Sequence, residues 1–244
     1  MKFLTDFPLI NAVLSGNQEG NIFELSGSDA VFVQHKSSFS WLQATEVTDI
    51  KQVLNFFIQE KKLLPYFHIY DAPVNLTEAI KADERFGIKL RKRIQLSYLK
   101  DTVDNSMNLP TGFSAVDINE SNFDQLDVFG LNLAGKFWKS KEYFLKHGYG
   151  VVIKSAAGKL ACVCYTCCIA DAVAEIDIAT LPEFQGKGLA KYATLKFIEK
   201  SITKGIKANW DCFEDNTGSL KTAKSNGFVM AKEYVFLSLY FNNQ

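Results

Sequence analysis

The sequence predicts an α/β protein in which an antiparallel set of strands is followed by helices that cover the sheet. Three strand-like runs, 150–154, 160–169 and 173–180, are separated only by short turns, which is typical of an antiparallel meander. A helix with one apolar face then runs from about residue 190 to residue 203. In the first half of the chain, strand-like runs alternate with an amphipathic helix, which predicts a smaller α/β unit there.

The predicted elements of the first half are short. Residues 21–25 and 30–35 are strand-like and flank a Ser-Gly-Ser-Asp turn. Residues 47–61 carry apolar side chains at steps of three and four, which predicts an amphipathic helix. Residues 89–99 alternate basic or polar residues with apolar ones and indicate a strand, although only loosely.

A polar stretch over residues 100–110 separates the two halves. Its Asp, Asn, Ser and Pro residues are typical of a loop or linker. We therefore predict an N-terminal α/β domain over residues 1–110 and a second domain over residues 111–244.

The second half contains further elements around the meander. Asp117 to Glu120 has the spacing of a capping box, which predicts that a helix begins there. After the long helix we expect a strand over 206–210, a short helix over 217–225 that ends at Gly227, and a final strand over 231–241.

Composition and charge disfavour several classes of protein. Hydrophobic residues make up 47% of the 244 residues, so the chain can bury a core. The 27 basic and 27 acidic residues give no net charge, which disfavours nucleic-acid binding by bulk charge. No apolar run reaches the roughly 20 residues that a membrane-spanning helix requires. Asp6 and Pro8 interrupt the apolar N-terminal segment, so we expect no signal peptide.

The cysteines predict the redox compartment. Four of the five lie within residues 162–168, too close together for an ordinary disulfide framework. They include a Cys-x-x-Cys pair, but no second pair or neighbouring His completes a zinc set. We therefore expect reduced core thiols, no metal, and a cytoplasmic protein.

The stretch from Gln185 to Ala190, QGKGLA, is the strongest candidate for a binding site. Its two glycines allow the backbone to turn tightly and to approach a ligand. The following helix directs its free N–H groups and its positive dipole end at the loop. The stretch therefore predicts a phosphate or pyrophosphate site, although it also fits a plain strand-to-helix turn.

Two well-known phosphate loops fit this stretch poorly. A P-loop requires Gly-Lys followed by Ser or Thr, and here Lys187 is followed by Gly188. A dinucleotide-binding fingerprint requires a third glycine where this chain has Lys191, and it places the glycines directly after the strand, whereas Pro182 to Phe184 intervene. Asp211 could serve as the ribose-binding acid, so a Rossmann-like nucleotide-binding protein with a parallel sheet stays as an alternative.

A third interpretation rests on a family resemblance. The segment from Ile178 to Ala190 resembles motif A of the GNAT N-acetyltransferases, whose signature Gln/Arg-x-x-Gly-x-Gly/Ala corresponds here to Gln185, Gly188 and Ala190. The segment from Asn216 to Phe228, NTGSLKTAKSNGF, is similar to their motif B helix. The resemblance covers about residues 115–240. It implies a GNAT fold with a mixed, mostly antiparallel sheet flanked by helices, in a branch of the family with an N-terminal extension.

The resemblance implies transfer of an acetyl group from acetyl-CoA, used as a co-substrate, to an amine. It implies that the loop amides hold the CoA pyrophosphate and that the open backbone of the preceding strand pairs with the pantetheine arm. It also implies that the start of the next helix contacts the cofactor, although Asn216 fits a helix N-cap equally well. The residues expected to bind the cofactor are Ile178, Ala179, Thr180, Gln185, Gly186, Lys187, Gly188, Leu189, Ala190, Asn216 and Ser219.

Two carboxylates on the third strand of the meander are the catalytic candidates. Residues i and i+2 share one face of a strand, so Glu175 and Asp177 point the same way. An acceptor amine must lose a proton when it attacks a thioester, and we favour Glu175 over Asp177 as the base. A solvated strand face or a structural ion pair is the alternative. Many GNAT enzymes place a Tyr in the motif B helix to protonate the leaving thiolate, whereas this chain has Ala223 there.

That missing Tyr leaves two hypotheses about function. The first is an acetyl-CoA-dependent N-acetyltransferase that works by direct attack of the amine. The second is a catalytically silent acyl-CoA-binding or regulatory module. The acceptor is expected to be a small-molecule or peptide amine whose site the N-terminal domain shapes, with neither nucleic acid nor membrane as a partner. The sequence does not predict the oligomeric state.

Overall fold

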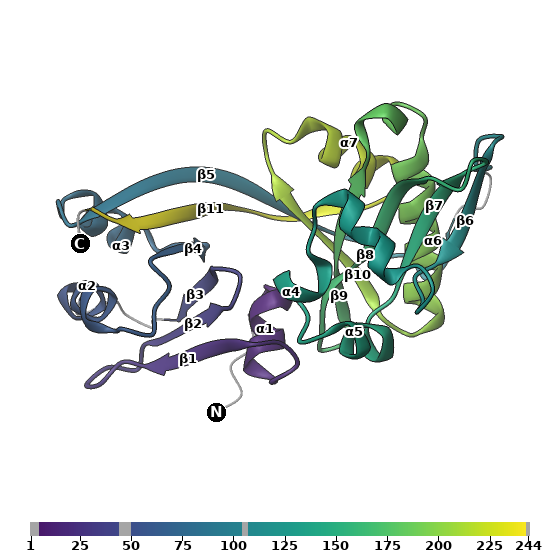
Figure 1. The fold of residues 1–244 in the computed structure, drawn as a ribbon. Coiled ribbons are helices and arrows are strands. Elements are labelled where there is room, and N and C mark those ends of the chain that lie inside the picture. Colours follow the sequence, from purple (N-terminus) through teal and green to yellow (C-terminus); the bar gives the residue numbers. More distant parts are fainter. Residues whose placement is uncertain (1–4, 44–49, 104–106, 243–244) are drawn as a thin grey trace. The chain divides into compact units, whose positions relative to one another are not determined.

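The computed structural model describes residues 5–43, 50–103 and 107–242. It divides the chain into two compact units. Unit 1 comprises residues 1–93 and 233–244, and unit 2 comprises residues 94–232 (Figure 1). Each unit contains its own cluster of buried hydrophobic side chains.

Unit 1 is a sheet with two helices packed on one face. Its strands pair antiparallel from β1 to β3, then β3 pairs in parallel with β4, and β4 pairs antiparallel with β11. Helices α2 and α3 bury their apolar sides against this sheet with Phe32, Phe57 and Leu76 at the centre of the cluster. The elements are α1 (Pro8–Leu14), β1 (Gly20–Glu24), β2 (Val31–His35), β3 (Phe39–Gln43), α2 (Ile50–Gln59), β4 (Tyr66–Tyr70), α3 (Val74–Lys81), the first part of β5 (Phe86–Ser97) and most of β11 (Val229–Phe241).

Unit 2 contains the meander and the long helix that the sequence predicts. Its strand order is β5-β10-β9-β8-β7-β6, with antiparallel pairs from β6 to β9 and a parallel pair between β9 and β10. The elements are β6 (Phe113–Asp117), the 3-10 helix η1 (Phe123–Phe129), α4 (Leu133–Lys136), α5 (Lys141–His147), β7 (Gly150–Ser155), β8 (Leu160–Ala170), β9 (Val173–Thr180), the 3-10 helix η2 (Pro182–Phe184), α6 (Leu189–Thr203), β10 (Lys207–Phe213) and α7 (Thr217–Ser225).

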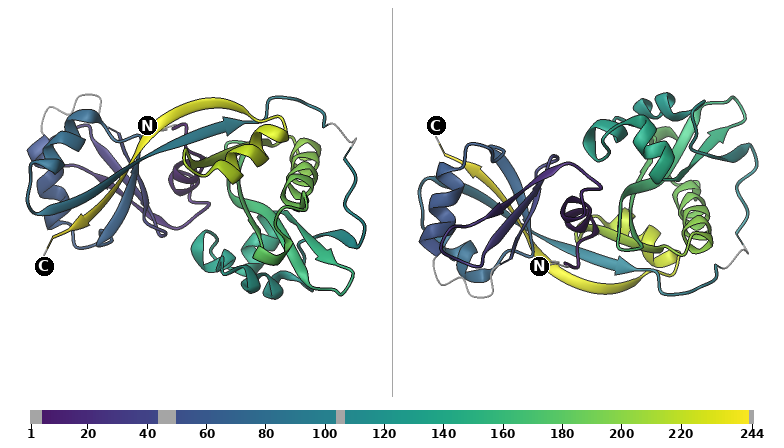
Figure 2. Two further views of the ribbon diagram at one scale, coloured as in Figure 1. Left: turned by 90° about the horizontal axis from the view of Figure 1, so that it is seen from above. Right: turned by 90° about the horizontal axis from the view of Figure 1, so that it is seen from below.

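Helix α6 covers one face of the unit 2 sheet. Its side chains Ala193, Phe197 and Ile198 are fully buried against the strands, together with Trp210 from β10. Figure 2 shows α6 on one side of strands β7–β9 and the segment of α4 and α5 on the other. Alternate residues of β9 therefore point either into the α6 core or toward the opposite face.

Two stretches of the chain have the same succession of elements, although the sequence shows no internal repeat. Residues 8–97 run α1-β1-β2-β3-α2-β4-α3-β5, and residues 141–241 run, apart from the 3-10 turn η2, α5-β7-β8-β9-α6-β10-α7-β11. In each, the first three strands pair antiparallel and the third pairs in parallel with the fourth. The last strands are exchanged, because β5 lies beside β10 and β11 lies beside β4.

Several sequence predictions are corrected by the structure. No α-helix begins at Asp117, which instead ends strand β6 and pairs with Val151; the next helical turn, η1, begins at Phe123. The alternative of a parallel, Rossmann-like sheet is wrong, because the strands of unit 2 from β6 to β9 are antiparallel. The compact units divide the chain at residues 93 and 232, and the predicted division into domains over residues 1–110 and 111–244 stays a prediction.

Candidate functional site

The QGKGLA loop connects strand β9 to helix α6 in unit 2. After β9 the chain makes the short turn η2 and then extends through Gln185. Gly186 and Gly188 have φ angles of 74° and 77°, in the left-handed region that glycine adopts without strain. Gly188 is the N-cap of α6, so the loop ends at the positive end of a helix of 15 residues.

The loop presents backbone donors to solvent. Residues 185–188 are exposed, and a Cβ atom built on Gly186 would meet no atom within 4 Å. Within the part of the chain that the structure describes, the amides of residues 186–190 donate no hydrogen bond to other residues. Free amides around two left-handed glycines at a helix N-terminus fit a phosphate or pyrophosphate group. The loop itself is fixed by hydrogen bonds from Gln185 Nε2 to Thr180 O at 3.3 Å and from Lys187 Nζ to Glu183 O at 3.3 Å.

Strand β9 has one open edge next to this loop. It pairs with β8 along its whole length, but with β10 only from Val173 to Glu175. Beyond that point β9 and β10 diverge, so the backbone from Ile176 to Thr180 has no strand partner on the β10 side among the described residues. An extended ligand with amide groups can add to such an edge as a further strand.

Glu175 and Asp177 share the face of the sheet opposite α6, as the i, i+2 spacing predicts. Ala174 and Ile176 lie in the core beneath α6, which directs the intervening acidic side chains to the other face. Glu175 is buried, with 7% of its surface exposed, and Asp177 is half-buried. The two carboxylates therefore lie at the point where β9 and β10 separate.

Asp177 is held by Tyr165, a residue that no pattern along the sequence singles out. The Tyr165 hydroxyl donates to Asp177 Oδ2 at 2.6 Å, and the Ile178 amide donates to Asp177 Oδ1 at 2.9 Å. Burial raises the pKa of Tyr165 well above its usual value, so its hydroxyl keeps the proton that it donates. Asp177 therefore has two fixed donors.

The start of α7 shows the capping role that the sequence left open. Asn216 is the N-cap of α7, and its Oδ1 accepts a hydrogen bond from the Ser219 amide at 3.1 Å. The Ser219 hydroxyl accepts a hydrogen bond from Trp210 Nε1 at 2.9 Å. Ala223, which stands where many GNAT enzymes have Tyr, is fully buried against the α6 core. Cofactor contacts of Asn216 and Ser219 stay predictions.

The cysteines that the sequence predicts to be core thiols pack in the interior, as does Trp138. All five cysteines are free and buried, and burial raises the pKa of Cys162 to about 12, so this thiol stays protonated. In the described residues, no group of three or more His, Cys, Asp and Glu side chains could hold a metal ion. Trp138 is also buried, and its indole donates to Thr166 O at 2.9 Å.

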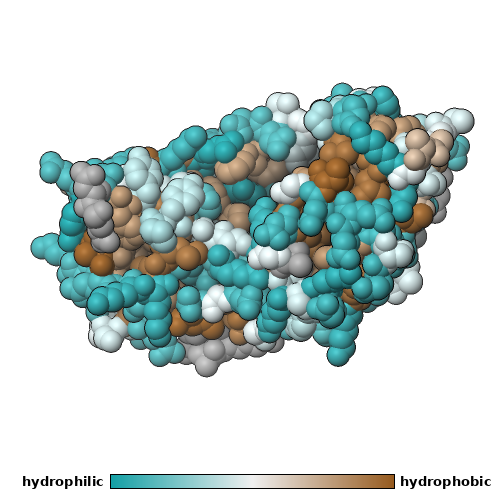
Figure 3. All heavy atoms as spheres, in the orientation of Figure 1, coloured by the Kyte–Doolittle hydropathy of each residue, from teal (hydrophilic) through white to brown (hydrophobic). Residues whose placement is uncertain are grey.

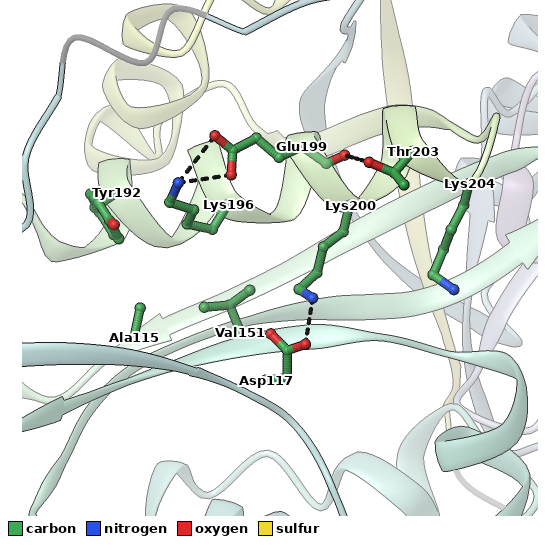
Figure 4. Close-up of a pocket in the computed structure, with 9 residues that line it drawn as sticks. All are labelled: Ala115, Asp117, Val151, Tyr192, Lys196, Glu199, Lys200, Thr203 and Lys204. Carbon is green, nitrogen blue, oxygen red and sulfur yellow. Dashed lines mark hydrogen bonds and ion pairs between the residues drawn. The ribbon is translucent and has the colours of Figure 1, made fainter.

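A separate cavity of about 560 Å³ lies on the α6 side of the sheet (Figure 4). Val151 at its floor belongs to the core beneath α6, so the cavity and the Glu175 side chain are on opposite faces. Four of its five charged groups form two ion pairs: Lys200 Nζ lies 2.6 Å from Asp117 Oδ2, and Lys196 Nζ lies 2.8 Å from Glu199 Oε2. The fifth, Lys204, lies over the Tyr149 ring. The cavity therefore does not contribute to the site at β9.

Hydrophobic surface is also present on unit 2. Figure 3 shows hydrophobic residues gathered on the surface beside α7, with hydrophilic residues around them. A ligand bound over such a patch would remove apolar surface from water.

A sheet of this order, opened between two parallel strands beside a glycine loop, is the fold of an acyltransferase. The chain belongs to the family described as GNAT acetyltransferase, which it matches over residues 34–237, and it is therefore an acetyltransferase enzyme. The match begins in unit 1, far upstream of the motif A and motif B segments, which lie in unit 2.

Known proteins similar to this chain agree with that assignment. The uncharacterized N-acetyltransferase YdfB of Bacillus subtilis (strain 168) is 24% identical over 182 residues, which are 75% of this chain and 69% of YdfB. A GCN5-related N-acetyltransferase-like protein from Streptococcus suis superposes with a TM-score of 0.71 at 20% identity and covers 97% of this chain and 94% of its own. A GCN5-related N-acetyltransferase from Kribbella flavida gives a TM-score of 0.66 at 15% identity, with 97% and 95% coverage. These structures show that the fold is shared. In the described residues, none of the helices is both long and apolar enough to span a bilayer.

Proposed function

We propose that the protein transfers an acetyl group from acetyl-CoA to an amine by direct attack of the amine nitrogen on the thioester. The observation that carries this proposal is the combination of free loop amides at residues 186–190 with the open edge of β9 beside them. A diphosphate fits the first feature, and the amide groups of pantetheine fit the second.

The cofactor-binding residues follow from these two features. The amides of Gly186, Lys187, Gly188, Leu189 and Ala190 would hold the diphosphate, and Gln185 orders the loop through its bond to Thr180. The backbone of Ile178, Ala179 and Thr180 would bind the pantetheine arm and direct its thioester toward Glu175. Asn216 and Ser219, at the start of α7, would border the cofactor.

Glu175 is the base in this proposal. As the amine nitrogen bonds to the thioester carbon, one N–H proton must leave. The Glu175 carboxylate lies on β9, the strand proposed to bind the pantetheine arm, and is suited to accept this proton directly or through a water molecule. Asp177 accepts hydrogen bonds from Tyr165 and the Ile178 amide, one on each of its two oxygens. As the carbon–sulfur bond breaks, the CoA sulfur leaves as a thiolate and takes a proton from solvent.

Glu175→Gln tests this assignment. We expect kcat to fall by about 10²- to 10⁴-fold, because the amide cannot accept the proton, whereas acetyl-CoA affinity stays within about twofold. Asp177→Asn should cost less, and Glu199→Gln, on the opposite face, should cost nothing. The measurements are CoA release over a panel of amines and calorimetric titration with acetyl-CoA.

The second candidate is the catalytically silent acyl-CoA-binding module, and the observation that favours it is the buried Ala223 at the usual Tyr position. Acetyl-CoA binding with no CoA release by the unchanged protein on any amine would support this module and contradict the proposed direct attack on acetyl-CoA. Free cysteines throughout favour the cytoplasm as the location.

A further inference from the structure

Asn209 is the partner of Glu175 across the last residue pair between β9 and β10. Its neighbours Ala208 and Trp210 are in the core beneath α6, so the Asn209 side chain lies on the same face as Glu175. Paired positions on neighbouring strands are about 5 Å apart. A group bound to Asn209 would therefore lie next to a group bound to Glu175.

The amide nitrogen of Asn209 is a donor without an acceptor. Only 4% of the residue is exposed, and its Oδ1 accepts a hydrogen bond from the Ser97 hydroxyl at 3.4 Å. Its Nδ2 makes no hydrogen bond with any part of the chain that the structure describes. Burial of an unpaired donor is unfavourable, and most buried polar groups in proteins have partners. A donor left unpaired at the point where two strands separate is available to an acceptor atom of a ligand.

The charges on this face favour a neutral acceptor atom. Glu175, Asp177 and Asp211 all lie on the face that Asn209 shares. A ligand carboxylate would be repelled by these groups, whereas a carbonyl oxygen would not. The same carboxylates attract a protonated amine.

We propose that Asn209 Nδ2 binds a neutral carbonyl oxygen next to the reactive amine, so that the acceptors are α-amino amides, including the N-terminal residues of peptides. This inference rests on the proposed function, because it places the amine at Glu175. In an α-amino amide, three bonds separate the amine nitrogen from the carbonyl oxygen. These two atoms are therefore close enough together to contact Glu175 and Asn209, which are paired on neighbouring strands. A site that binds an oxygen in this way discriminates against analogues that lack it.

The test compares two acceptors of similar shape, L-alaninamide and sec-butylamine, which lacks the carbonyl group. For the unchanged protein we expect L-alaninamide to be the better acceptor, and also better than L-alanine, whose carboxylate is charged. Asn209→Leu should lower kcat/KM for L-alaninamide by about 10- to 100-fold and change that for sec-butylamine by less than about threefold. Intrinsic reactivity of the amines cancels when each variant is compared with the unchanged protein.

Controls separate recognition from folding. Asn209→Asp keeps the shape but loses the donor, so it should lose discrimination like Asn209→Leu. Thr194→Val alters another buried polar side chain, on α6, and should leave the ratio of the two acceptors unchanged. Calorimetric affinity for acetyl-CoA should be the same for all these variants.

An equal loss of activity on both acceptors in Asn209→Leu would overturn the inference, because the donor would then serve the thioester or the fold. Preference of the unchanged protein for L-alanine would also overturn it. Failure of the proposed function is distinguishable, since it would appear as no CoA release from the unchanged protein with any amine.

Discussion

At the scale of single residues, His68 in unit 1 illustrates how burial controls a proton. Its Nδ1 lies 2.8 Å from the Ser238 hydroxyl, and its ring stacks on the ring of Phe236. The guanidinium of Arg93 also lies over the Phe236 ring. Burial, and second the positive charge of Arg93, lower the pKa of His68 from 6.5 to about 4. The neutral ring is therefore the form that the folded protein holds.

This shift predicts a dependence of stability on pH. Between pH 6.5 and about pH 4 the unfolded chain binds a proton at His68 that the folded chain does not, so stability falls as pH falls through this window. The full shift corresponds to about 3 kcal/mol, and solvent around a half-buried ring reduces the expected effect to about 1–2 kcal/mol. Urea unfolding at pH 7 and at pH 4.5 measures it. His68→Asn keeps a hydrogen-bonding side chain without a titratable group and should lose less stability over this interval; an identical loss would contradict the assignment.

Residue-scale predictions from sequence succeeded where a local rule decides the outcome. The i, i+2 spacing placed Glu175 and Asp177 on one face, as the structure shows. Local spacing failed at Asp117, since pairing with Val151 in the sheet outweighs a capping-box pattern. Tyr165 on β8 is the direct cross-strand partner of Asp177 on β9. The pairing depends on a register shift between Thr166 and Cys168. Long-range contacts of this kind have no signature along the chain.

At the scale of elements, the β9–α6 loop provides a prediction with an internal control. Gly186 and Gly158 have φ angles of 74° and 78°, and a Cβ on either would meet nothing within 4 Å. Changing either to Ala should therefore lower the free energy of unfolding by a similar amount, about 1–2 kcal/mol, from backbone strain alone. Gly186→Ala should also weaken acetyl-CoA binding by at least about tenfold, because relief of that strain turns the loop amides away from the diphosphate.

Gly158 lies in the turn between β7 and β8, so Gly158→Ala should leave acetyl-CoA affinity unchanged. Thermal unfolding and calorimetric titration of both variants make the comparison. Equal affinities for the two variants would mean that the loop does not bind the diphosphate.

Elements with strong periodicity or clear turns could be predicted, whereas short buried ones could not. The strands of the meander and the helix α6 were found within a few residues. Helix α1 was missed because six of its seven residues are buried, and a helix that is apolar all round shows no amphipathic pattern. Strands β3 and β4 have five residues each, too few for an alternation to be distinctive.

At the scale of the whole molecule, the exchange of β5 and β11 explains why the compact units divide differently from the predicted domains. A boundary read from composition falls in the polar stretch 100–110, but a unit is defined by the strands that complete its sheet. Leu237 and Leu239 of β11 belong to the core of unit 1, and Ile94 and Leu96 of β5 belong to the core of unit 2. The sequence carries no local signal for such an exchange, because β11 and β4 are more than 150 residues apart along the chain.

The exchange predicts that neither half of the chain folds alone. A break between Asp104 and Asn105 leaves the first fragment without β11, so that β4 has an unpaired edge. The second fragment lacks β5, so that β10 has an unpaired edge. Unpaired edges and incomplete cores favour aggregation over folding. Fragments 1–104 and 105–244 refolded together should form a 1:1 complex with the circular dichroism of the intact chain and with acetyl-CoA affinity. Each fragment alone should give no cooperative unfolding transition, and cooperative unfolding of fragment 105–244 by itself would show instead that the second half is a domain independent of β5.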